Sequence, residues 1–310
     1  MPVKIAVLGT GAMGSVYAAL LASAGNEVWA VETWAEHVDA IRRHGLRVTG
    51  ASGDRTVRVN ATTRAEEVGA VDLVVVATKA MDVEAAARAA LTLLGPDTIV
   101  LSIQNGLGSS ETAAAVLGEE RVLLGVAGGF GASVVAPGWA HHEGMELLRL
   151  GELRGPTTER LERLAETWRA AGFTVQTYDD IDRLVWEKLI CNVCFSGPCA
   201  VLDASIGEVM ADENAWAVAT GCAVEAYDVG RALGVDLPFD EPIEHVRAFG
   251  RAIPNAHPSL LLDLRAGRHT EIAHINGAIP RVGRTVGVAA PVNETVTALV
   301  KVLEFRLPAT

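Results

Sequence analysis

Short apolar runs rich in valine and isoleucine alternate with helical patterns through the first half of the chain. Five of these runs are expected to form strands: 3–8, 27–32, 71–80, 98–106 and 121–129. Strands that alternate with helices predict βαβ units and a parallel sheet. Residues 45–59 have instead the pattern of an inserted hairpin that turns at residues 52–54.

The pattern changes after a further strand-like run at 173–180, which follows an amphipathic helix at 157–172. Beyond it only helical segments are expected: 183–196, 212–233, 241–252, 258–266, 270–286 and 292–306. A chain of 310 residues also exceeds the usual range of a single hydrophobic core. We therefore predict two domains, residues 1–181 and residues 182–310.

The first helix of the second half carries an unusual polar stripe within "WEKLICNVCFS" (186–196). Lys188, Asn192 and Ser196 are four residues apart, so in a helix they share one face. One interpretation is structural, with Lys188 reaching solvent and the other two side chains satisfied by local hydrogen bonds. The alternative is that the stripe lines a ligand-binding cleft.

A glycine pattern between the first strand and the first helix is the strongest local signal. Gly9, Gly11 and Gly14 form G-x-G-x-x-G, followed by a helix over 12–24 and a second strand. Gly9 allows a tight turn, Gly11 lets a pyrophosphate approach the backbone, and Gly14 allows close packing of helix on strand. The pattern predicts dinucleotide binding. The fold class that we expect is an α/β Rossmann-type doubly wound parallel sheet followed by an all-α helical domain.

Glu32 ends the second strand, where a carboxylate accepts hydrogen bonds from the adenosine ribose of NAD. The 2′-phosphate of NADP would place a charge of nearly −2 beside it. At about 5 Å and an effective dielectric constant near 20, each unit of repulsion is about 3 kcal/mol before screening. NAD is therefore the expected cofactor. In the alternative, Glu32 points to water and Arg42, Arg43 or Arg47 binds a phosphate.

Further polar residues occupy positions with two interpretations. Lys79 and Asn105 lie at the carboxyl ends of the third and fourth predicted strands, where ligands of this fold bind. Either residue could equally be a solvated loop residue. Ser259 begins a predicted helix and Glu271 lies in the first turn of the next, where both residue types are common for structural reasons.

The charge and the cysteines limit the classes of function. A net charge of −12 argues against nucleic-acid or anionic-membrane partners, which need a positive field. There is no apolar run of membrane-spanning length and no signal-peptide pattern at the N-terminus, so a cytoplasmic location is expected. The four cysteines are expected to be reduced and buried, including the C-x-x-C of Cys191 and Cys194. His141 and His142 are expected in a loop, and we predict no metal site.

Several motifs together resemble the ketopantoate reductase (2-dehydropantoate 2-reductase) family over nearly the whole chain. These motifs are "VLGTGAMG", "ATKA" with Lys79, "QNGLG" with Asn105, "WEKLICN" with Lys188 and Asn192, and "AGRHTEIAHINGAIPRVGRTVGVAAPVNET". The last stretch is the most specific. The resemblance implies a Rossmann domain and a helical domain, with the substrate reduced in a cleft between them.

The resemblance also implies roles for individual residues. Lys188 would be the general acid that protonates the carbonyl oxygen while the nicotinamide delivers hydride to C2. Asn105 would bind the nicotinamide ribose, Asn192, Ser196 and Ser259 would bind the substrate, and Glu271 would border the nicotinamide and Lys188. The implied cofactor contacts also include these residues: Gly9, Thr10, Gly11, Ala12, Met13, Gly14, Glu32, Lys79 and Ala132.

Three departures from the family pattern matter, one for the cofactor and two for the identity of the substrate. "VETWAEH" replaces the usual arginine that reads the 2′-phosphate of NADP, which agrees with the argument for NAD. Ser196 replaces a second asparagine one turn after Asn192, and "NAHPS" shifts Asn255 by one position relative to Ser259. We expect an NAD-dependent reductase of a small 2-keto acid, and a homodimer by analogy of fold. The alternatives are a catalytically silent dinucleotide sensor and a related dehydrogenase of a sugar acid or other hydroxy acid.

Overall fold

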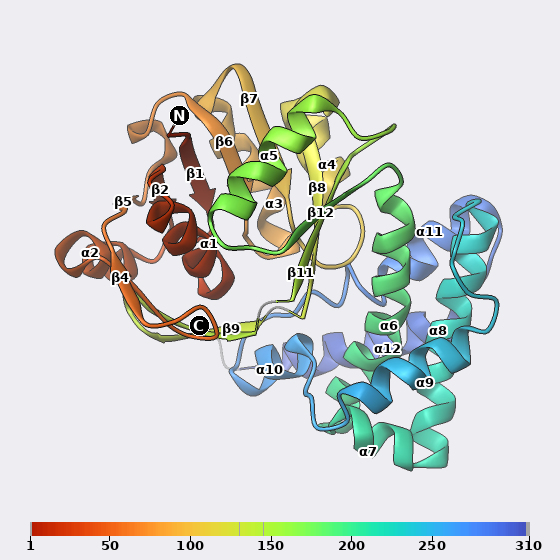
Figure 1. Ribbon diagram of the computed structural model, residues 1–310. Helices are drawn as coiled ribbons and strands as arrows, with labels where there is room; N and C mark the ends of the chain where they lie inside the picture. Colours follow the sequence, from red (N-terminus) through yellow and green to blue (C-terminus); the bar gives the residue numbers. More distant parts are fainter. Residues whose placement is uncertain (1, 130, 145, 308–310) are drawn as a thin grey trace. The chain divides into compact units, whose positions relative to one another are not determined.

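The computed structural model describes residues 2–129, 131–144 and 146–307, and the chain divides into two compact units (Figure 1). The first unit contains the residues up to Gln104 and Ser109–Ile181. The second contains Asn105–Gly108 and the residues from Asp182 onward. Four residues that follow a strand of the first unit thus belong to the second.

The first unit is built on an eight-stranded, mostly parallel sheet with the order β12-β11-β8-β7-β6-β1-β2-β5. Only the β8–β11 pairing is antiparallel. The strands are β1 (Lys4–Leu8), β2 (Glu27–Val31), β5 (Asn60–Thr62), β6 (Val71–Val76), β7 (Leu94–Ser102), β8 (Val122–Gly128), β11 (Leu147–Glu152) and β12 (Val175–Tyr178). The chain turns back across β1 to form β6, which confirms the doubly wound Rossmann-type topology.

Helices cover both faces of this sheet, as Figure 1 shows. They are α1 (Ala12–Ser23), α2 (Ala35–His44), α3 (Val83–Ala90), α4 (Ser109–Leu117) and α5 (Glu159–Ala170), with single 3-10 turns η1 (Ala65–Glu67), η2 (Ala80–Asp82), η3 (Leu91–Leu93) and η4 (Glu119–Arg121). Alternate residues of β1 enter different cores. Ile5 and Val7 pack in the core that includes α1 and α5, whereas Ala6 and Leu8 pack in the core that includes α3 and α4. Burial on both faces explains why these strands are almost continuously apolar.

A second sheet of four strands has the order β4-β3-β10-β9. Its strands are β3 (Leu46–Gly50), β4 (Arg55–Val57), β9 (Gly131–Ala136) and β10 (Trp139–Gly144). The antiparallel β3–β4 pair confirms the predicted hairpin. Helix α1 contacts this sheet as well as the main one, which explains its burial on nearly all sides.

The loop predicted around His141 and His142 was wrong, because both residues lie in β10. β10 pairs in parallel with β3, about ninety residues earlier in the chain, and Thr49 Oγ1 lies 3.1 Å from His141 Nδ1. Local patterns do not report such a distant pairing. Strands β5 and β11 were also not predicted.

The second unit consists of helices around one apolar core. They are α6 (Ile181–Leu202), α7 (Ile206–Ala211), α8 (Glu213–Ala232), α9 (Pro242–Ala252), α10 (Ser259–Arg265), α11 (Ala278–Val286) and α12 (Pro291–Phe305). This confirms the predicted all-α second half, although α7 was not predicted. Helix α6 is long and apolar enough to cross a membrane, but 67% of its apolar window is buried inside the protein, as in the core helix of a folded domain.

Two predicted helix boundaries were wrong, and prolines explain one of them. The helix expected over 270–286 begins only at Ala278. Pro280 therefore lies in the first turn, where no backbone N–H is needed; a helix running from 270 would place it in the interior. The other helix continues past Ser196 to Leu202 despite Pro198, because nearly all residues in this stretch are buried.

Candidate functional site

The turn between β1 and α1 has the geometry of a phosphate-binding turn. Gly9 has a φ of +83°, and a Cβ atom on Gly14 would lie 2.1 Å from the Gly9 carbonyl oxygen. A Cβ on Gly11 would meet no atom within 4 Å, so the backbone is open there to a ligand. The first turn of α1 carries no acidic residue, so the positive end of the helix is not neutralised. These residues fit a dinucleotide pyrophosphate.

The other residues of this turn, Thr10, Ala12 and Met13, differ in exposure. Thr10 is fully buried, and its Oγ1 makes no hydrogen bond among the described residues. Ala12 and Met13 begin α1 and are partly exposed. Helix starts present backbone N–H groups that lack intrahelical acceptors, which is why they bind anions.

Glu32 follows β2 directly and is partly exposed. Its Oε1 accepts hydrogen bonds from Thr33 N at 2.7 Å, Thr33 Oγ1 at 3.2 Å and Trp34 N at 3.2 Å. These bonds fix the carboxylate at the end of the strand through one of its two oxygens.

The three arginines considered as phosphate ligands have other partners. Arg42 donates from Nε to Ala61 O at 2.8 Å, and Arg43 lies 3.6 Å from Asp39. Arg47 pairs with Asp54 at 3.0 Å and stacks over the Trp139 ring.

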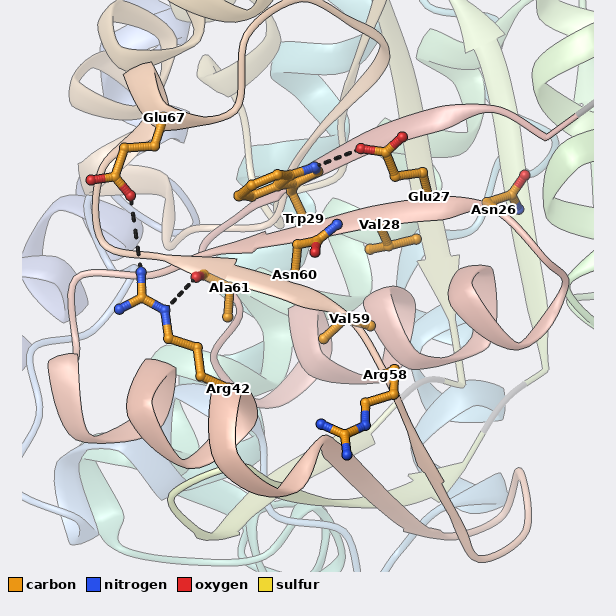
Figure 2. Close-up of a pocket in the computed structure, with 10 residues that line it drawn as sticks. All are labelled: Asn26, Glu27, Val28, Trp29, Arg42, Arg58, Val59, Asn60, Ala61 and Glu67. Atoms are coloured by element: carbon orange, nitrogen blue, oxygen red, sulfur yellow. Dashed lines mark hydrogen bonds and ion pairs between the residues drawn. The ribbon is translucent and has the colours of Figure 1, made fainter.

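A pocket of about 560 Å³ lies at the edge formed by β2 and β5 (Figure 2). Three of its charged residues have partners within the pocket: Trp29 Nε1 donates to Glu27 Oε1 at 2.9 Å, and Arg42 lies 3.9 Å from Glu67. Arg42 also covers a carbonyl of the edge strand β5. The pocket includes the beginning of β2, whereas Glu32 follows its end, and none of the predicted site residues lines it.

The loops after β6 and β7 are joined by Gln104. Its Nε2 donates to Val76 O at 2.5 Å and to Thr78 O at 3.3 Å, while its Oε1 accepts from Ser102 Oγ at 2.7 Å. Thr78 lies against the glycine turn, because a Cβ on Gly9 would come within 2.7 Å of it. Lys79 is the next residue, partly exposed at the start of η2. No role was predicted for Gln104 from the sequence, although its position two residues after β7 was a usable signal.

The polar stripe of α6 is real, and its lysine has a defined partner. Lys188 Nζ donates to Asn105 Oδ1 at 2.8 Å, and both residues belong to the second unit. Lys188 and Asn192 are partly exposed, whereas Ser196 is buried. The two residues predicted to act together, 83 positions apart in sequence, are thus in contact.

The Asn105–Gly108 segment is held by three contacts within the second unit. Besides the Lys188 bond, Leu107 N donates to His274 O at 2.9 Å and Arg281 Nη2 donates to Leu107 O at 3.3 Å. Burial lowers the pKa of His274, and the positive charge of Arg281 lowers it further. The negative charge of Glu271 has the opposite effect and is the smallest of the three. The sequence analysis assigned no role to His274 or Arg281.

Two family models match this sequence. The model described as Ketopantoate reductase PanE/ApbA matches residues 5–155, and the model of its C-terminal part matches residues 180–304. The chain belongs to the ketopantoate reductase family. It is therefore an oxidoreductase of the class that acts on CH–OH groups, and its family was correctly predicted from the sequence.

Named ketopantoate reductases resemble the chain over nearly its full length. A 2-dehydropantoate 2-reductase of Mesorhizobium japonicum is 32% identical, over 96% of this chain and 97% of that protein. The crystal structure of a PanE/ApbA family ketopantoate reductase from Ralstonia eutropha JMP134 has 33% identity and a TM-score of 0.90, covering 98% of this chain and 99% of that one. A ternary structure of D-mandelate dehydrogenase with NADH and anilino(oxo)acetate has 29% identity and a TM-score of 0.89, covering 99% and 100%.

The remaining residues expected from the ketopantoate reductase pattern differ in exposure and lie in different elements. Glu271 is 5% exposed in the irregular segment before α11. Ser259 is exposed at the first position of α10. Ala132 lies in β9, opposite His142 of β10. Their contacts with cofactor and substrate stay predictions.

The cysteines of the C-x-x-C are unpaired and buried in the core, as predicted. All four cysteines are buried in the helical unit. Burial raises the pKa of the Cys191 thiol to about 12 and also raises the pKa of the Cys194 thiol well above its ordinary value. A neutral thiol is a poor nucleophile and metal ligand. The described part of the chain contains no group of three or more His, Cys, Asp or Glu side chains placed to hold a metal ion.

Proposed function

We propose that the protein transfers hydride between NAD(H) and C2 of a small 2-keto or 2-hydroxy acid, with Lys188 as the general acid. The observation that carries the proposal is the 2.8 Å hydrogen bond between Lys188 and Asn105, in a chain that also has an open glycine turn.

The cofactor would be held by residues already described. The glycine turn would bind the pyrophosphate, Glu32 the adenosine ribose, and Asn105 the nicotinamide ribose, with Lys79, Ala132 and Glu271 as further contacts. When bound, the nicotinamide supplies or accepts the hydride.

Lys188 would act on the carbonyl oxygen of the substrate. Its ammonium would hydrogen-bond this oxygen, stabilise the negative charge that develops there and give up a proton to it. Asn105 Oδ1 accepts from the same ammonium and so limits the orientations of the side chain. Asn192, Ser196 and Ser259 would hold the carboxylate and hydroxyl groups of the substrate.

NAD is the favoured cofactor because Glu32 would repel a 2′-phosphate. The three local hydrogen bonds hold the carboxylate in place, and the nearby arginines are engaged elsewhere. The similarity to D-mandelate dehydrogenase, solved with NADH, supports the same choice.

The substrate side chain has two candidates. Most named relatives are 2-dehydropantoate 2-reductases, which favours ketopantoate. The likeness to D-mandelate dehydrogenase, together with Ser196 and the shifted Asn255, favours an aromatic 2-keto acid as the second candidate.

Initial rates with NADH and NADPH, measured side by side on ketopantoate and phenylglyoxylate, test the proposal. We expect turnover that favours NADH, and the better substrate decides between the two candidates. Turnover only with NADPH would contradict the role of Glu32. Tight NADH binding without turnover on any 2-keto acid would favour a catalytically silent dinucleotide sensor.

Lys188→Met tests the catalytic role. We expect a loss of kcat of at least about 100-fold with little change in the Kd for NADH, because the variant loses the proton donor and not the nucleotide site. Lys301→Met, at an exposed position on α12, is the control and should keep its turnover. Equal turnover of Lys188→Met and the wild type would exclude Lys188 as the general acid.

A further inference from the structure

The orientation of the peptide group between Thr10 and Gly11 decides whether the Gly11 N–H of the glycine turn faces a bound anion. The Thr10 carbonyl and the Gly11 N–H belong to the same trans peptide, so they point in opposite directions. Thr10 O accepts a hydrogen bond from Ser15 Oγ at 2.8 Å, on the inner side of the turn. The Gly11 N–H is thereby directed away from Ser15, on the side open to a ligand.

Ser15 is in turn held by a buried histidine. His37 Nε2 lies 3.3 Å from Ser15 Oγ, and both residues are fully buried. His37 Nδ1 accepts a hydrogen bond from the backbone N–H of Gly138 at 3.1 Å. A backbone N–H only donates, so Nδ1 carries no proton, and the proton of the neutral imidazole is on Nε2.

The donors and acceptors therefore form one directed chain. Gly138 N–H donates to His37 Nδ1, His37 Nε2–H donates to Ser15 Oγ, and the Ser15 hydroxyl donates to Thr10 O. Trp34 stacks on the His37 ring with centroids 5.1 Å apart, and its backbone N–H is bound by Glu32. His37 thus lies between the glycine turn and the carboxylate proposed to bind the ribose.

We propose that His37 and Ser15 are positioning residues that orient the Gly11 N–H toward the dinucleotide pyrophosphate. The relay touches neither cofactor nor substrate and acts through the Thr10 carbonyl. The inference rests on the proposed dinucleotide binding. It assigns the buried histidine of α2 a role in cofactor affinity and none in proton transfer to the substrate.

The decisive variant is Ser15→Ala, which removes one hydroxyl and leaves a good helix former within α1. With the peptide free to rotate, we expect the Kd for NADH and for ADP-ribose to rise about fivefold to tenfold, the effect of losing one oriented hydrogen bond. KM for NADH should rise by a similar factor, with a smaller change in kcat. Ser23→Ala is the matched control, because Ser23 Oγ donates to Ala19 O at 2.8 Å at the far end of the same helix.

Two substitutions of His37 separate the halves of the relay. In His37→Gln the amide nitrogen stands in for Nε2–H and keeps the bond to Ser15. In His37→Asn the amide oxygen stands in for Nδ1 and keeps only the bond to Gly138. We expect the asparagine variant to weaken NADH binding as much as Ser15→Ala does, and the glutamine variant to bind more like the wild type. Because the relay acts in series, Ser15→Ala combined with His37→Asn should bind no more weakly than the weaker single variant.

The outcomes are distinguishable. If the wild type binds NADH and a folded Ser15→Ala binds it equally well, the relay has no positioning role. If Ser15→Ala fails to fold, the two His37 variants decide, and equal Kd values for them would overturn the inference. If the wild type binds neither NADH nor ADP-ribose, the proposed function itself fails.

Discussion

The glycines of the turn after β1 meet different surroundings. Gly14 is packed against the Gly9 carbonyl, whereas a Cβ atom added to Gly11 would point into open space. The same residue type therefore serves packing at one position and ligand access at the other.

Substituting these two glycines should separate stability from binding. Gly14→Ala would force a Cβ to within 2.1 Å of backbone, so we expect a loss of about 3 kcal/mol or more in the free energy of unfolding. Gly11→Ala, whose Cβ would meet no atom within 4 Å, should reduce that free energy less than Gly14→Ala does, and it should raise the Kd for NADH at least tenfold, on the order of the loss of one contact. Urea unfolding and NADH titration measure the two quantities. Equal stability of both variants would contradict the packing role of Gly14.

Glu32→Gln tests the cofactor preference at a single charge. Glutamine keeps an oxygen that accepts from Thr33 N and Trp34 N while it removes the repulsion of a 2′-phosphate. We expect the ratio of kcat/KM for NADPH to that for NADH to rise about tenfold. The rise is smaller than the unscreened repulsion would give, because solvent and salt screen the charges. Glu27→Gln, at the exposed start of the same strand, is the control. An unchanged ratio would show that Glu32 does not select the cofactor.

At the scale of elements, buried amides join α6, α8 and α12. Asn276 Nδ2 donates to Val193 O at 2.9 Å and to Asn293 Oδ1 at 3.0 Å. Asn293 Nδ2 donates to Cys222 O at 3.0 Å and to Glu225 at 2.8 Å. This network fixes the helix that carries Lys188.

Asn293→Ala should destabilise the helical unit. It removes the hydrogen bonds of the Asn293 side chain to Asn276, to the Cys222 carbonyl and to Glu225, although Glu225 keeps its bonds from the backbone N–H groups of residues 292 and 293. Losing these three bonds in a buried network costs about 2–3 kcal/mol in the free energy of unfolding. Chemical denaturation measures this change. Asn214→Ala, exposed near the start of α8, should stay within about 0.5 kcal/mol of the wild type. Similar losses for the two variants would mean that the network contributes little.

The sequence predicted the elements whose patterns are local. Most strands of the main sheet, the inserted hairpin and the glycine turn were identified because their spacing, turns and burial repeat over a few residues, whereas β5 and β11 of the main sheet were not predicted. Strands β9 and β10 were missed because β10 depends on pairing with β3 far away in the chain. The contact of Lys188 with Asn105 was expected only through the family resemblance, and the His37–Ser15 bond joins two helices that no local pattern relates.

At the scale of the whole molecule, histidines that are buried or half-buried link stability to pH. Burial lowers the pKa of four of them: His37, His142, His245 and His274. Each stays neutral in the folded state at a pH where the unfolded chain already binds a proton. Their contribution to stability is therefore complete above about pH 6.5 and is lost as the pH falls toward the lowered pKa values.

Urea unfolding at pH 7.5, 6.5 and 5.5 should show this loss. We expect the free energy of unfolding to decrease below pH 6.5, by at most about 1.4 kcal/mol per pH unit for each histidine. Carboxylates with lowered pKa values, such as Glu162 and Asp179, lose their stabilising contribution only as the pH falls below about 4.5, so they do not change the free energy of unfolding over this range. His37→Gln should flatten the slope, whereas His44→Gln, exposed at the end of α2, should not. A constant free energy from pH 7.5 to 5.5 would contradict the prediction.

The homodimer expected from fold analogy, the cytoplasmic location and the absence of nucleic-acid partners stay predictions. Light scattering of the purified protein tests the first of them. A monomer at micromolar concentration would contradict it.

The four residues Asn105–Gly108 have a consequence for protein engineering. The chain passes between the two units three times, at 104/105, 108/109 and 181/182, so a cut at a single linker does not separate them. A chimera that takes its helical half from another family member should also take that member's version of this short segment, because its anchoring contacts are made there. A swap at 181/182 alone would combine the other member's lysine at position 188 with the Asn105–Gly108 segment of this chain, so the two partners of the hydrogen bond would come from different proteins.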